Sequence, residues 1–571
     1  LVGIANGFDF TEGASTLTQQ LIKNNIFPGF VNENTFFDRV ERKLQEQYLA
    51  LAFEKEMSKE EILEAYMNTI NLGQGCLGVQ TASTRYFNKD VADLTLSECA
   101  VIAAITQNPT KYDPVTNPEE NANRREEVLN KMLEQNYIDQ AQYDEAIADP
   151  VYDRILQTAA ITEDTTPYSY FTDAMIEDVI NDLMEKKGYT ETQAYNQLYS
   201  NGLTIKSTQD LAIQQICDEV VADESLYPMT EYGVEYALTI HRADGTAENY
   251  YTETLGAYIS NTYGDANPLV FSSEDEARAM VEEYKSTLGI NTEAGDIVDE
   301  NLTITLQPQT SVVVMDQYTG QVKAIVGGRG AKTTSLSLNR ATDSTRQPGS
   351  CFKVLSTYAP GLNECGMTLA TTIKDEPYRY ASGQQVNNWD GKYIGQARVR
   401  YAIEHSMNVC AVRTLTETVG LEKGYQYLQK FGFTTLVNND PDYPGMSDVA
   451  QSTALGGITR GVYNIEMTAA YAAIANGGVY TEPILYTEIL DHDGNVLIDN
   501  SAPETHEVIK DSTAYLLTSA MEDVINRGTG TSARLSNMPA AGKTGTTENS
   551  TDLWLSAYTP YYTASVWGGY D

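Results

Sequence analysis

The sequence has little of what several common kinds of functional site require. Its 571 residues include only four histidines, which leave little room for a histidine metal site or a serine–histidine–aspartate triad. Its six cysteines form no C-x-x-C pair, so their spacing indicates neither a zinc ribbon nor a disulfide framework. No apolar run reaches the roughly 18 residues that a membrane-spanning helix needs. The pattern therefore predicts no set of metal ligands.

Positive charge is scarce as well. The chain has 38 Lys and Arg residues against 79 Asp and Glu residues, a formal net charge of −41. Such an acidic surface would repel a phosphate backbone, so we expect no nucleic-acid partner. By region, the net charge is −12 for residues 1–150, −22 for 151–305 and −7 for 306–571. The acidity is concentrated in the middle of the chain.

The length predicts three or four folding units at about 150 residues each. Residues 1–150 carry helical patterns: Arg42–Met57 has apolar residues at helical spacing, and Ser58 with Glu61 forms a capping box before the next helix. Residues 151–305 mix helical stretches, such as Tyr170–Lys187, with turns and show no catalytic spacing. We expect this second region to be an acidic α+β linker domain.

Residues 306–571 combine strands and helices. Ser311–Met315 and Gln321–Val326 have the composition of a β-hairpin, and Thr551–Ala557 and Thr563–Gly569 that of further strands. Helical patterns lie between them, including one over 398–419. Because strands occur at both ends of the region, we expect the two ends to share one sheet.

Three short motifs in this last region can carry chemistry. Ser350 follows a Pro-Gly turn and precedes Lys353 by three residues, which places hydroxyl and amine on one face of a helix. An amine that burial keeps neutral can take the proton of such a serine. The other motifs are Ser406-Met407-Asn408 and Lys543-Thr544-Gly545-Thr546. Each alone is also typical of a helix cap, a polar loop or a surface strand.

In this order the motifs match the S-x-x-K, S-x-N and K-T-G set of penicillin-binding proteins and serine β-lactamases. With the flanking stretches Leu455–Gly478 and Trp567–Asp571, residues 306–571 resemble the transpeptidase domain of class A penicillin-binding proteins. The resemblance implies a β-lactamase-like α/β fold with a central antiparallel sheet.

The resemblance also implies roles for the motif residues. Ser350 would attack the D-Ala-D-Ala carbonyl of a peptidoglycan stem peptide, with Lys353 as general base. Ser406, held electrostatically by Lys543, would relay a proton to the leaving D-Ala, and Asn408 would orient the peptide amide.

The third motif would bind the substrate. Thr544 and Thr546 would hold the terminal carboxylate, and Gly545 would let the substrate backbone lie against the strand. The backbone N–H groups of Ser350 and Thr546 would form the oxyanion hole. We expect this reaction to need no cofactor, and we expect β-lactams to inhibit it.

The N-terminal region resembles the family 51 peptidoglycan glycosyltransferase domain, which is lysozyme-like and mainly α-helical. Its polar stretch before Lys23 and its Arg42-Lys43-x-x-Glu46 motif carry the resemblance. Glu46 would assist the pyrophosphate side of the reaction, with a divalent cation (Mg²⁺ or Mn²⁺) as a candidate cofactor. The residues implied to bind the donor diphosphate of lipid II are Ser15, Thr16, Gln19, Lys23, Arg42 and Lys43, supported by Tyr66 and Asn68.

The first motif of that family, which carries its catalytic base, is not found, and the chain begins with Leu1. We therefore expect a preceding segment with a membrane anchor, and impaired glycosyl transfer by residues 1–571. The favoured organisation is a glycosyltransferase domain (1–150), an acidic linker domain (151–305) and a transpeptidase domain (306–571).

The leading hypothesis is a bifunctional peptidoglycan synthase on the extracytoplasmic face of the bacterial cell membrane. It would act on lipid II and stem peptides, with other cell-wall synthesis proteins as candidate partners. One alternative is a serine β-lactamase or D,D-carboxypeptidase, which uses the same C-terminal motifs with water as acceptor. The other is a non-catalytic sensor of β-lactams or cell-wall fragments.

Overall fold

The computed structural model describes residues 15–26, 36–74, 76–109, 111–155, 167–243, 245–264, 268–292, 295–547 and 550–571. The first 14 residues of the expected glycosyltransferase domain lie outside these ranges. The chain divides into two compact units. The first holds Leu1–Pro167, Ile176–Ile205 and Ile489–Ile498, and the second holds Tyr168–Met175, Lys206–Glu488 and Asp499–Asp571.

The first 155 residues are helical where the structure describes them, as expected. The predicted capping box is confirmed: the N–H of Ser58 donates to Glu61 Oε2 at 2.7 Å, and the N–H of Glu61 donates to Ser58 Oγ at 3.2 Å. Tyr86 and Val101 lie in a buried core of this region. The helices are α2 (Leu17–Ile26), α3 (Phe36–Glu56), α4 (Lys59–Thr69), α5 (Val79–Phe87), α6 (Leu96–Ile105), α7 (Pro118–Glu134) and α8 (Gln140–Ala148).

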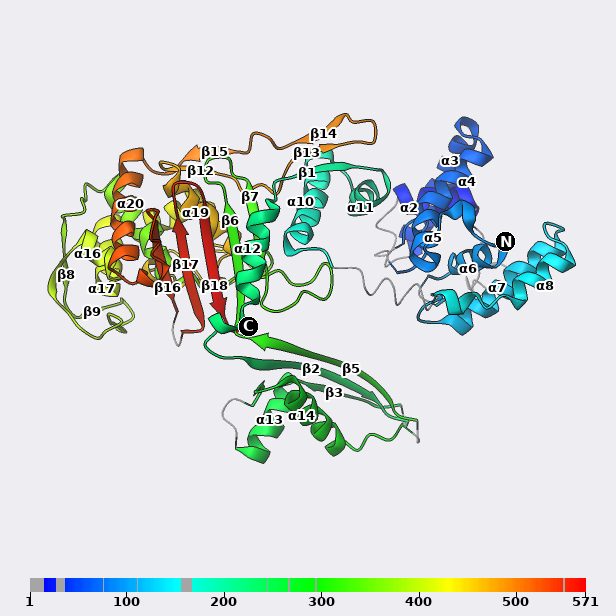
Figure 1. Cartoon of the computed structure of the whole chain (residues 1–571), viewed down its shortest axis with the longest axis horizontal. Helices are drawn as coiled ribbons and strands as arrows, with labels where there is room; N and C mark the ends of the chain where they lie inside the picture. Colours follow the sequence, from blue (N-terminus) through cyan, green and yellow to red (C-terminus); the bar gives the residue numbers. More distant parts are fainter. Residues whose placement is uncertain are drawn as a thin grey trace. The chain divides into compact units, whose positions relative to one another are not determined.

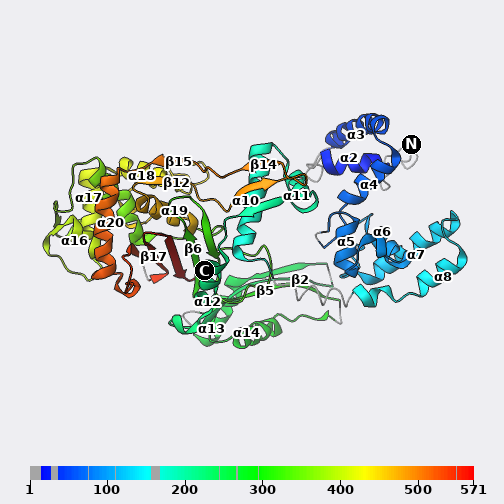
Figure 2. The ribbon, with the colours of Figure 1, turned by 45° about the horizontal axis from the view of Figure 1, so that its top comes forward.

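The acidic middle region is the mixed α and β structure that was expected. It begins with α10 (Tyr170–Lys187), as predicted, and continues through α11 (Glu191–Ser200), β1 (Thr204–Ser207) and α12 (Leu211–Ala222). A four-stranded antiparallel sheet follows, in which β2 pairs with β5 along its whole length and with β3 and β4 on its other side. The sheet packs against α13 and α14 (Figure 2). The bounds are β2 (Glu231–His241), β3 (Ala247–Tyr251), α13 (Thr252–Tyr263), β4 (Val270–Phe271), α14 (Glu274–Thr287) and β5 (Ile297–Gln307).

The central sheet of the C-terminal region has five antiparallel strands in the order β16-β17-β18-β6-β7 (Figure 1). Strand β18 pairs with β6 from Thr563 opposite Met315 to Gly569 opposite Gln309. The expectation that both ends of this region share one sheet is therefore confirmed. The strands are β6 (Gln309–Met315), β7 (Val322–Val326), β16 (Ala541–Thr546), β17 (Asp552–Tyr558) and β18 (Thr563–Gly569).

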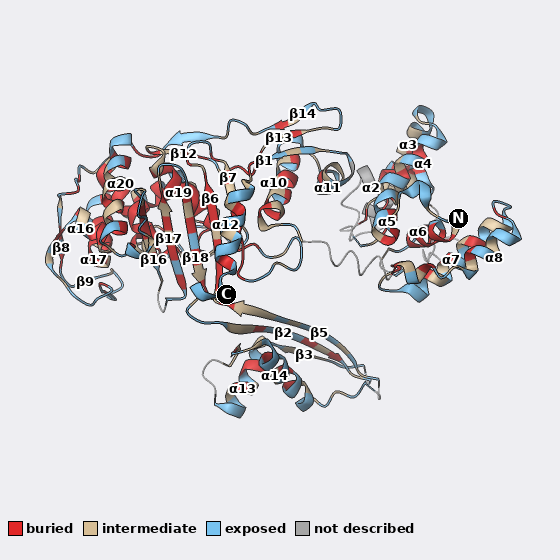
Figure 3. Ribbon diagram, viewed as in Figure 1, coloured by how far each residue is buried: buried red, intermediate tan, exposed pale blue. Residues whose placement is uncertain are grey.

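Helices cover this sheet. Helix α19 packs against β6, β17 and β18 and is buried over almost its whole length (Figure 3), whereas α20 packs against the edge strand β16. The helices are α15 (Ala359–Asn363), α16 (Val399–Glu404), α17 (Asn408–Thr414), α18 (Leu421–Lys430), α19 (Asn464–Ala475) and α20 (Asp511–Asn526).

Short strands complete the C-terminal region. Strand β8 pairs with β11, β9 with β10, and β12 with β15, all antiparallel. Their bounds are β8 (Thr372–Asp375), β9 (Tyr378–Arg379), β10 (Gln385–Val386), β11 (Gly395–Arg398), β12 (Val479–Thr481), β13 (Tyr486–Leu490), β14 (Val496–Asp499) and β15 (Thr505–Glu507).

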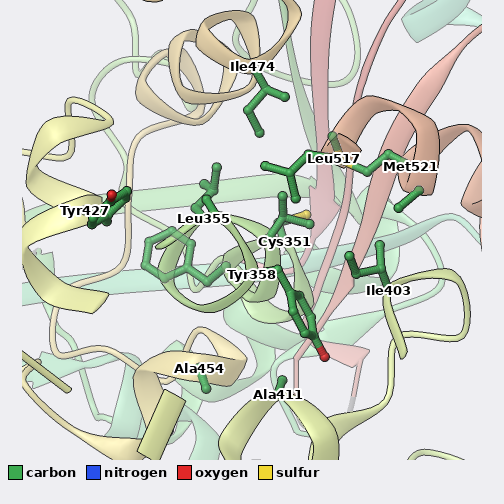
Figure 4. Close-up of a cluster of buried hydrophobic side chains, with 14 of the residues drawn as sticks. Cys351, Leu355, Tyr358, Ile403, Ala411, Tyr427, Ala454, Ile474, Leu517 and Met521 are labelled. Carbon is green, nitrogen blue, oxygen red and sulfur yellow. The ribbon is translucent and has the colours of Figure 1, made fainter. Parts of the chain in front are cut away.

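The largest hydrophobic core surrounds the segment that follows Ser350. Cys351, Leu355 and Tyr358 are fully buried there, among side chains from α16, α17, α19 and α20 (Figure 4). Burial of this segment on all sides gives the serine a rigid support. Among the described helices, none combines the length and the apolar composition needed to cross a membrane.

Candidate active sites

Ser350 lies in a tight turn at the head of the buried segment. Gly349–Cys351 forms a 3₁₀ turn, Lys353–Tyr358 is wound as a π-helix, and α15 follows. The prediction of a helix after Ser350 is correct, but the segment is wound as 3₁₀ and π turns instead of a regular α-helix. Pro360 has no N–H to donate to the carbonyl of Ser356 one turn earlier, which interrupts the α-helical hydrogen-bond ladder. Such local π-helical turns are common at functional sites.

Two glycines allow this turn to lie close to strand β16. Gly349 has a φ of +53°, and a Cβ atom there would lie 2.9 Å from the carbonyl oxygen of Thr546. A Cβ atom on Gly545 would lie 2.7 Å from the carbonyl oxygen of Pro348. Neither position has room for a side chain. Because glycine has none, the backbone of the turn can lie directly against the edge strand. Ser350 is thereby held beside the third motif.

Two buried lysines meet at Ser406. The Nζ atom of Lys353 lies 2.6 Å from Ser406 O, 3.1 Å from Ser406 Oγ and 2.5 Å from Asn408 Oδ1. Lys543 Nζ donates to Ser406 Oγ at 2.8 Å and to the carbonyl of Thr544 at 2.9 Å. The structure thus brings the three sequence motifs into one hydrogen-bonded cluster. Among the described residues, no hydrogen bond joins Ser350 to Lys353.

The two lysines differ in acidity. Burial, reinforced by the positive charge of Lys543, holds the pKa of Lys353 well below its usual value. Burial lowers the pKa of Lys543 to about 8. Burial therefore favours the neutral amine form of Lys353, whereas Lys543, with a pKa of about 8, is mainly an ammonium ion at neutral pH.

With Lys353 in the neutral form, one arrangement of protons satisfies the cluster. A neutral amine has two N–H bonds and one lone pair, so Lys353 can donate to Ser406 O and Asn408 Oδ1 while its lone pair accepts from the Ser406 hydroxyl. The ammonium group of Lys543 then donates to the same hydroxyl oxygen. Ser406 is thus placed to pass a proton between Lys353 and a third group.

Ser406 has an unusual backbone. Its φ of +52° lies in the left-handed region, which residues other than glycine and asparagine rarely adopt. The helix expected over 398–419 is therefore interrupted here, between α16 and α17. The break turns the Ser406 hydroxyl toward both lysines instead of along a helix face. Strained residues of this kind cluster at functional sites.

Strand β16 carries the third motif at the edge of the sheet, as expected. Thr546 is exposed and Thr544 is half-buried. The hydroxyl of Thr544 lies 2.7 Å from that of Thr529, an exposed residue in the turn after α20. Sequence reasoning missed Thr529, because a lone threonine 15 residues before Thr544 belongs to none of the three motifs.

In the N-terminal region, Glu46 lies at the centre of a charged cluster. It is fully buried and forms ion pairs with Arg42 and with Lys43, the latter at 2.6 Å. Lys43 Nζ also donates to Ser15 Oγ at 2.8 Å. Burial and the charge of Lys43 lower the pKa of Lys23. The structure therefore brings most of the predicted diphosphate-binding residues together.

The remaining predicted residues are Thr16, Gln19, Tyr66 and Asn68. The N–H of Thr16 donates to Gln19 Oε1 at 2.9 Å, and the N–H of Gln19 donates to Thr16 Oγ1 at 3.2 Å, which caps the start of α2. The hydroxyl of Tyr66 lies 3.3 Å from Gln20 Oε1. Asn68 is exposed near the end of α4.

The N-terminal cluster does not fit a directly bound divalent cation. Both carboxylate oxygens of Glu46 are engaged by cationic side chains. The parts of the chain that the structure describes contain no group of three His, Cys, Asp or Glu side chains able to hold a metal ion.

The N-terminal and C-terminal regions each match a known protein family. Residues 3–133 match the transglycosylase family, and residues 310–569 match the penicillin-binding protein transpeptidase domain. Penicillin-binding protein 1A of Clostridium acetobutylicum is 34% identical over 98% of this chain and 61% of its own length. The chain thus spans about three-fifths of that relative.

Two further relatives are similar over most of their length. Penicillin-binding protein 1A of Clostridium perfringens (strain 13) is 32% identical over 100% of this chain and 74% of its own. The crystal structure of penicillin-binding protein 1A from Haemophilus influenzae shares the fold, with a TM-score of 0.56 at 23% identity, over 90% of this chain and 82% of its own. The chain belongs to the class A penicillin-binding proteins.

Proposed function

We propose that this protein is a bifunctional peptidoglycan synthase that cross-links stem peptides through an acyl-enzyme on Ser350 and polymerises the glycan of lipid II. The observation that carries the proposal is the cluster in which Lys353 and Lys543 share the hydroxyl of Ser406, with the pKa of Lys353 lowered by burial. A general base and a proton relay at neutral pH are what serine acyl transfer requires.

Acylation follows from this arrangement. When substrate binds, the lone pair of Lys353 turns from Ser406 to Ser350 and takes its proton, while Ser350 Oγ forms a bond to the carbonyl carbon of the penultimate D-Ala. The resulting oxyanion accepts from the backbone N–H groups of Ser350 and Thr546. Lys353 then protonates Ser406, whose own proton passes to the leaving amine as the C–N bond breaks. D-Ala departs and the acyl-enzyme remains.

The second half-reaction reverses these proton transfers. The amine of a second stem peptide attacks the ester carbonyl, gives a proton to Lys353 through Ser406, and displaces Ser350 Oγ, which recovers its proton. Thr544 and Thr546, on the free edge of β16, are placed to hold the terminal carboxylate of the donor. Water as acceptor would make the protein a carboxypeptidase or β-lactamase instead.

For glycan polymerisation, the argument is electrostatic. Arg42, Lys43 and Lys23 form a cationic group, and Glu46 holds the first two in place by ion pairs. We infer that this group binds the diphosphate of lipid II and neutralises the charge that develops as the diphosphate leaves. On this basis we propose that the protein acts at the extracytoplasmic face of the bacterial membrane, where other cell-wall synthesis proteins are candidate partners.

Labelling with a fluorescent penicillin tests the transpeptidase function. We expect a stable covalent adduct on the full chain and none on the Ser350→Ala variant. Absence of labelling in the unmodified chain would exclude both transpeptidation and covalent β-lactam sensing. Rapid loss of the adduct would favour a β-lactamase. A stable adduct without cross-linking of stem-peptide substrates would favour the sensor.

Binding of a lipid II analogue tests the glycosyltransferase function. We expect Lys43→Ala to weaken binding of the diphosphate-bearing analogue and to leave penicillin labelling unchanged. Lys131→Ala, which removes an exposed lysine from α7, is the matched control and should bind normally. Equal binding by the Lys43→Ala variant would exclude the proposed diphosphate site.

A further inference from the structure

A loop outside the three motifs forms hydrogen bonds to the Ser406-Met407-Asn408 segment and its neighbours. Asn388, in the loop between β10 and β11, is buried, and its Oδ1 atom accepts from the backbone N–H groups of Asn408 at 3.0 Å and Val409 at 3.2 Å. These are the first N–H groups of α17, which have no partner within the helix. Met407, at the cap position, supplies no side-chain hydrogen bond, so Asn388 caps the helix from a distance.

A buried carboxylate fixes the orientation of Asn388. Its Nδ2 atom donates to Asp375 Oδ1 and to the carbonyl of Lys392, both at 2.8 Å. Asp375 is fully buried at the end of β8, and its Oδ2 atom accepts from the N–H of Ile394 at 2.8 Å. Every donor of the Asn388 amide is used, so the amide cannot rotate without breaking a buried hydrogen bond.

The neighbours of Asn388 hold the same segment from both sides of Ser406. The carbonyl of Asn387 accepts from Asn408 Nδ2 at 2.8 Å. The indole N–H of Trp389 donates to the carbonyl of His405 at 3.2 Å. Three consecutive loop residues therefore bind the residues that flank the strained Ser406. The left-handed conformation of Ser406 persists only if its surroundings hold it.

We propose that Asn388 and Asp375 are positioning residues for acyl transfer: they hold the backbone at Asn408 and Val409 so that Ser406 and Asn408 meet Lys353. This inference rests on the proposed transpeptidase function. Neither residue touches the reacting atoms. Loss of the Asn388 bonds frees the first turn of α17, and the 2.5 Å contact between Lys353 and Asn408 Oδ1 loosens with it.

The test compares the rate constant of acylation by a fluorescent penicillin with the fraction of protein that is labelled at completion. A merely structural role would lower the labelled fraction and leave the rate constant of the remaining molecules unchanged. We expect Asn388→Ala to lower the rate constant up to about 100-fold, the effect of a displacement near 1 Å, at an unchanged labelled fraction.

Asp375→Asn is a milder variant that keeps the side-chain shape. Its single acceptor oxygen cannot serve both Asn388 Nδ2 and the N–H of Ile394, so we expect a smaller fall, about 10-fold. Asp390→Asn makes the same chemical change on an exposed carboxylate of the same loop and should acylate like the unmodified chain.

Exchange of the pair gives the decisive comparison. In the double variant Asp375→Asn, Asn388→Asp, the new amide can donate to the new carboxylate, whose other oxygen still accepts from the N–H groups of Asn408 and Val409. We expect its acylation rate constant to exceed that of Asn388→Asp alone by about 10-fold.

Single variants that acylate at the original rate constant would overturn the inference, and so would an exchange variant no faster than Asn388→Asp. A fall in the labelled fraction alone would also overturn it, because it would show that the pair serves only stability. No labelling of the unmodified chain would instead reject the proposed function itself, so the two failures are distinguishable.

Discussion

Lys353 and Lys543 approach one hydroxyl group, with their Nζ atoms 3.1 and 2.8 Å from Ser406 Oγ. Two ammonium groups this close in a buried site would repel each other strongly, and this repulsion adds to the effect of burial in lowering the pKa of Lys353. The repulsion is part of the catalytic design that we infer. Burial, together with the charge of Lys543 on β16, lowers the pKa of Lys353 and so favours the neutral form that can act as a base.

The pH dependence of acylation follows from this pair. Lys543 has to stay charged, and its pKa is about 8, so we expect the acylation rate constant to fall as pH rises above about 8. Lys353 has to be neutral, so the rate constant falls at low pH, below the depressed pKa of Lys353.

In a Lys543→Gln variant the repulsion is gone, so the pKa of Lys353 rises. The fall in the acylation rate constant at low pH (the acidic limb of the pH profile) then moves to higher pH. Stopped-flow acylation by penicillin from pH 5 to 10 measures both limbs. An acidic limb at the same pH in both proteins would contradict this account.

Close packing of the nucleophile turn predicts the effect of a single methyl group. We expect Gly545→Ala to lower the free energy of unfolding by about 1–3 kcal/mol and to slow acylation, because its Cβ atom would lie 2.7 Å from the carbonyl oxygen of Pro348. Gly568→Ala, on strand β18 of the same sheet, is the control, since a Cβ atom there meets nothing nearer than 3.8 Å. Thermal unfolding and penicillin labelling of both variants decide the point; equal stability would refute it.

The backbone strain at Ser406 can be measured directly. Ser406→Ala and Ser406→Gly both remove the proton relay, and both should lose turnover. Because φ is +52°, the glycine variant should be more stable than the alanine variant by about 1 kcal/mol. Urea denaturation of the two variants gives this difference, and an alanine variant as stable as the glycine variant would show that the site is unstrained.

Tryptophan fluorescence should report on the site. Of the three tryptophans, Trp554 and Trp567 are 4% and 0% exposed, whereas Trp389 is 72% exposed and bonds to the residue before Ser406. Acrylamide should therefore quench mainly Trp389, and Trp389→Phe should remove most of the quenching. We expect penicillin to reduce quenching in the unmodified chain but not in Ser350→Ala. Quenching that persists in Trp389→Phe would contradict this assignment.

Local features could be predicted from sequence. The capping box at Ser58 and Glu61, helix α10 and strand β18 depend on near neighbours and alternating patterns, and each was confirmed. The strands of the middle region were not located, although the apolar residues from Val234 to Ile240 recur at every second position, a two-residue period that could have indicated β2. The helix break at Ser406 has no such signal, because nothing in a serine marks a left-handed conformation.

The sequence by itself determined the order of the three motifs, and with them the family and the serine, lysine and asparagine side chains that carry the chemistry. Only the tertiary structure decided that burial lowers the pKa of both lysines and that the charge of Lys543 lowers that of Lys353 further. It also decided that Asn388 and Asp375, far from the motifs along the chain, hold Ser406 and Asn408 in place. The physical reason is that desolvation and charge repulsion depend on what packs around a group, and those neighbours come from distant segments of the chain.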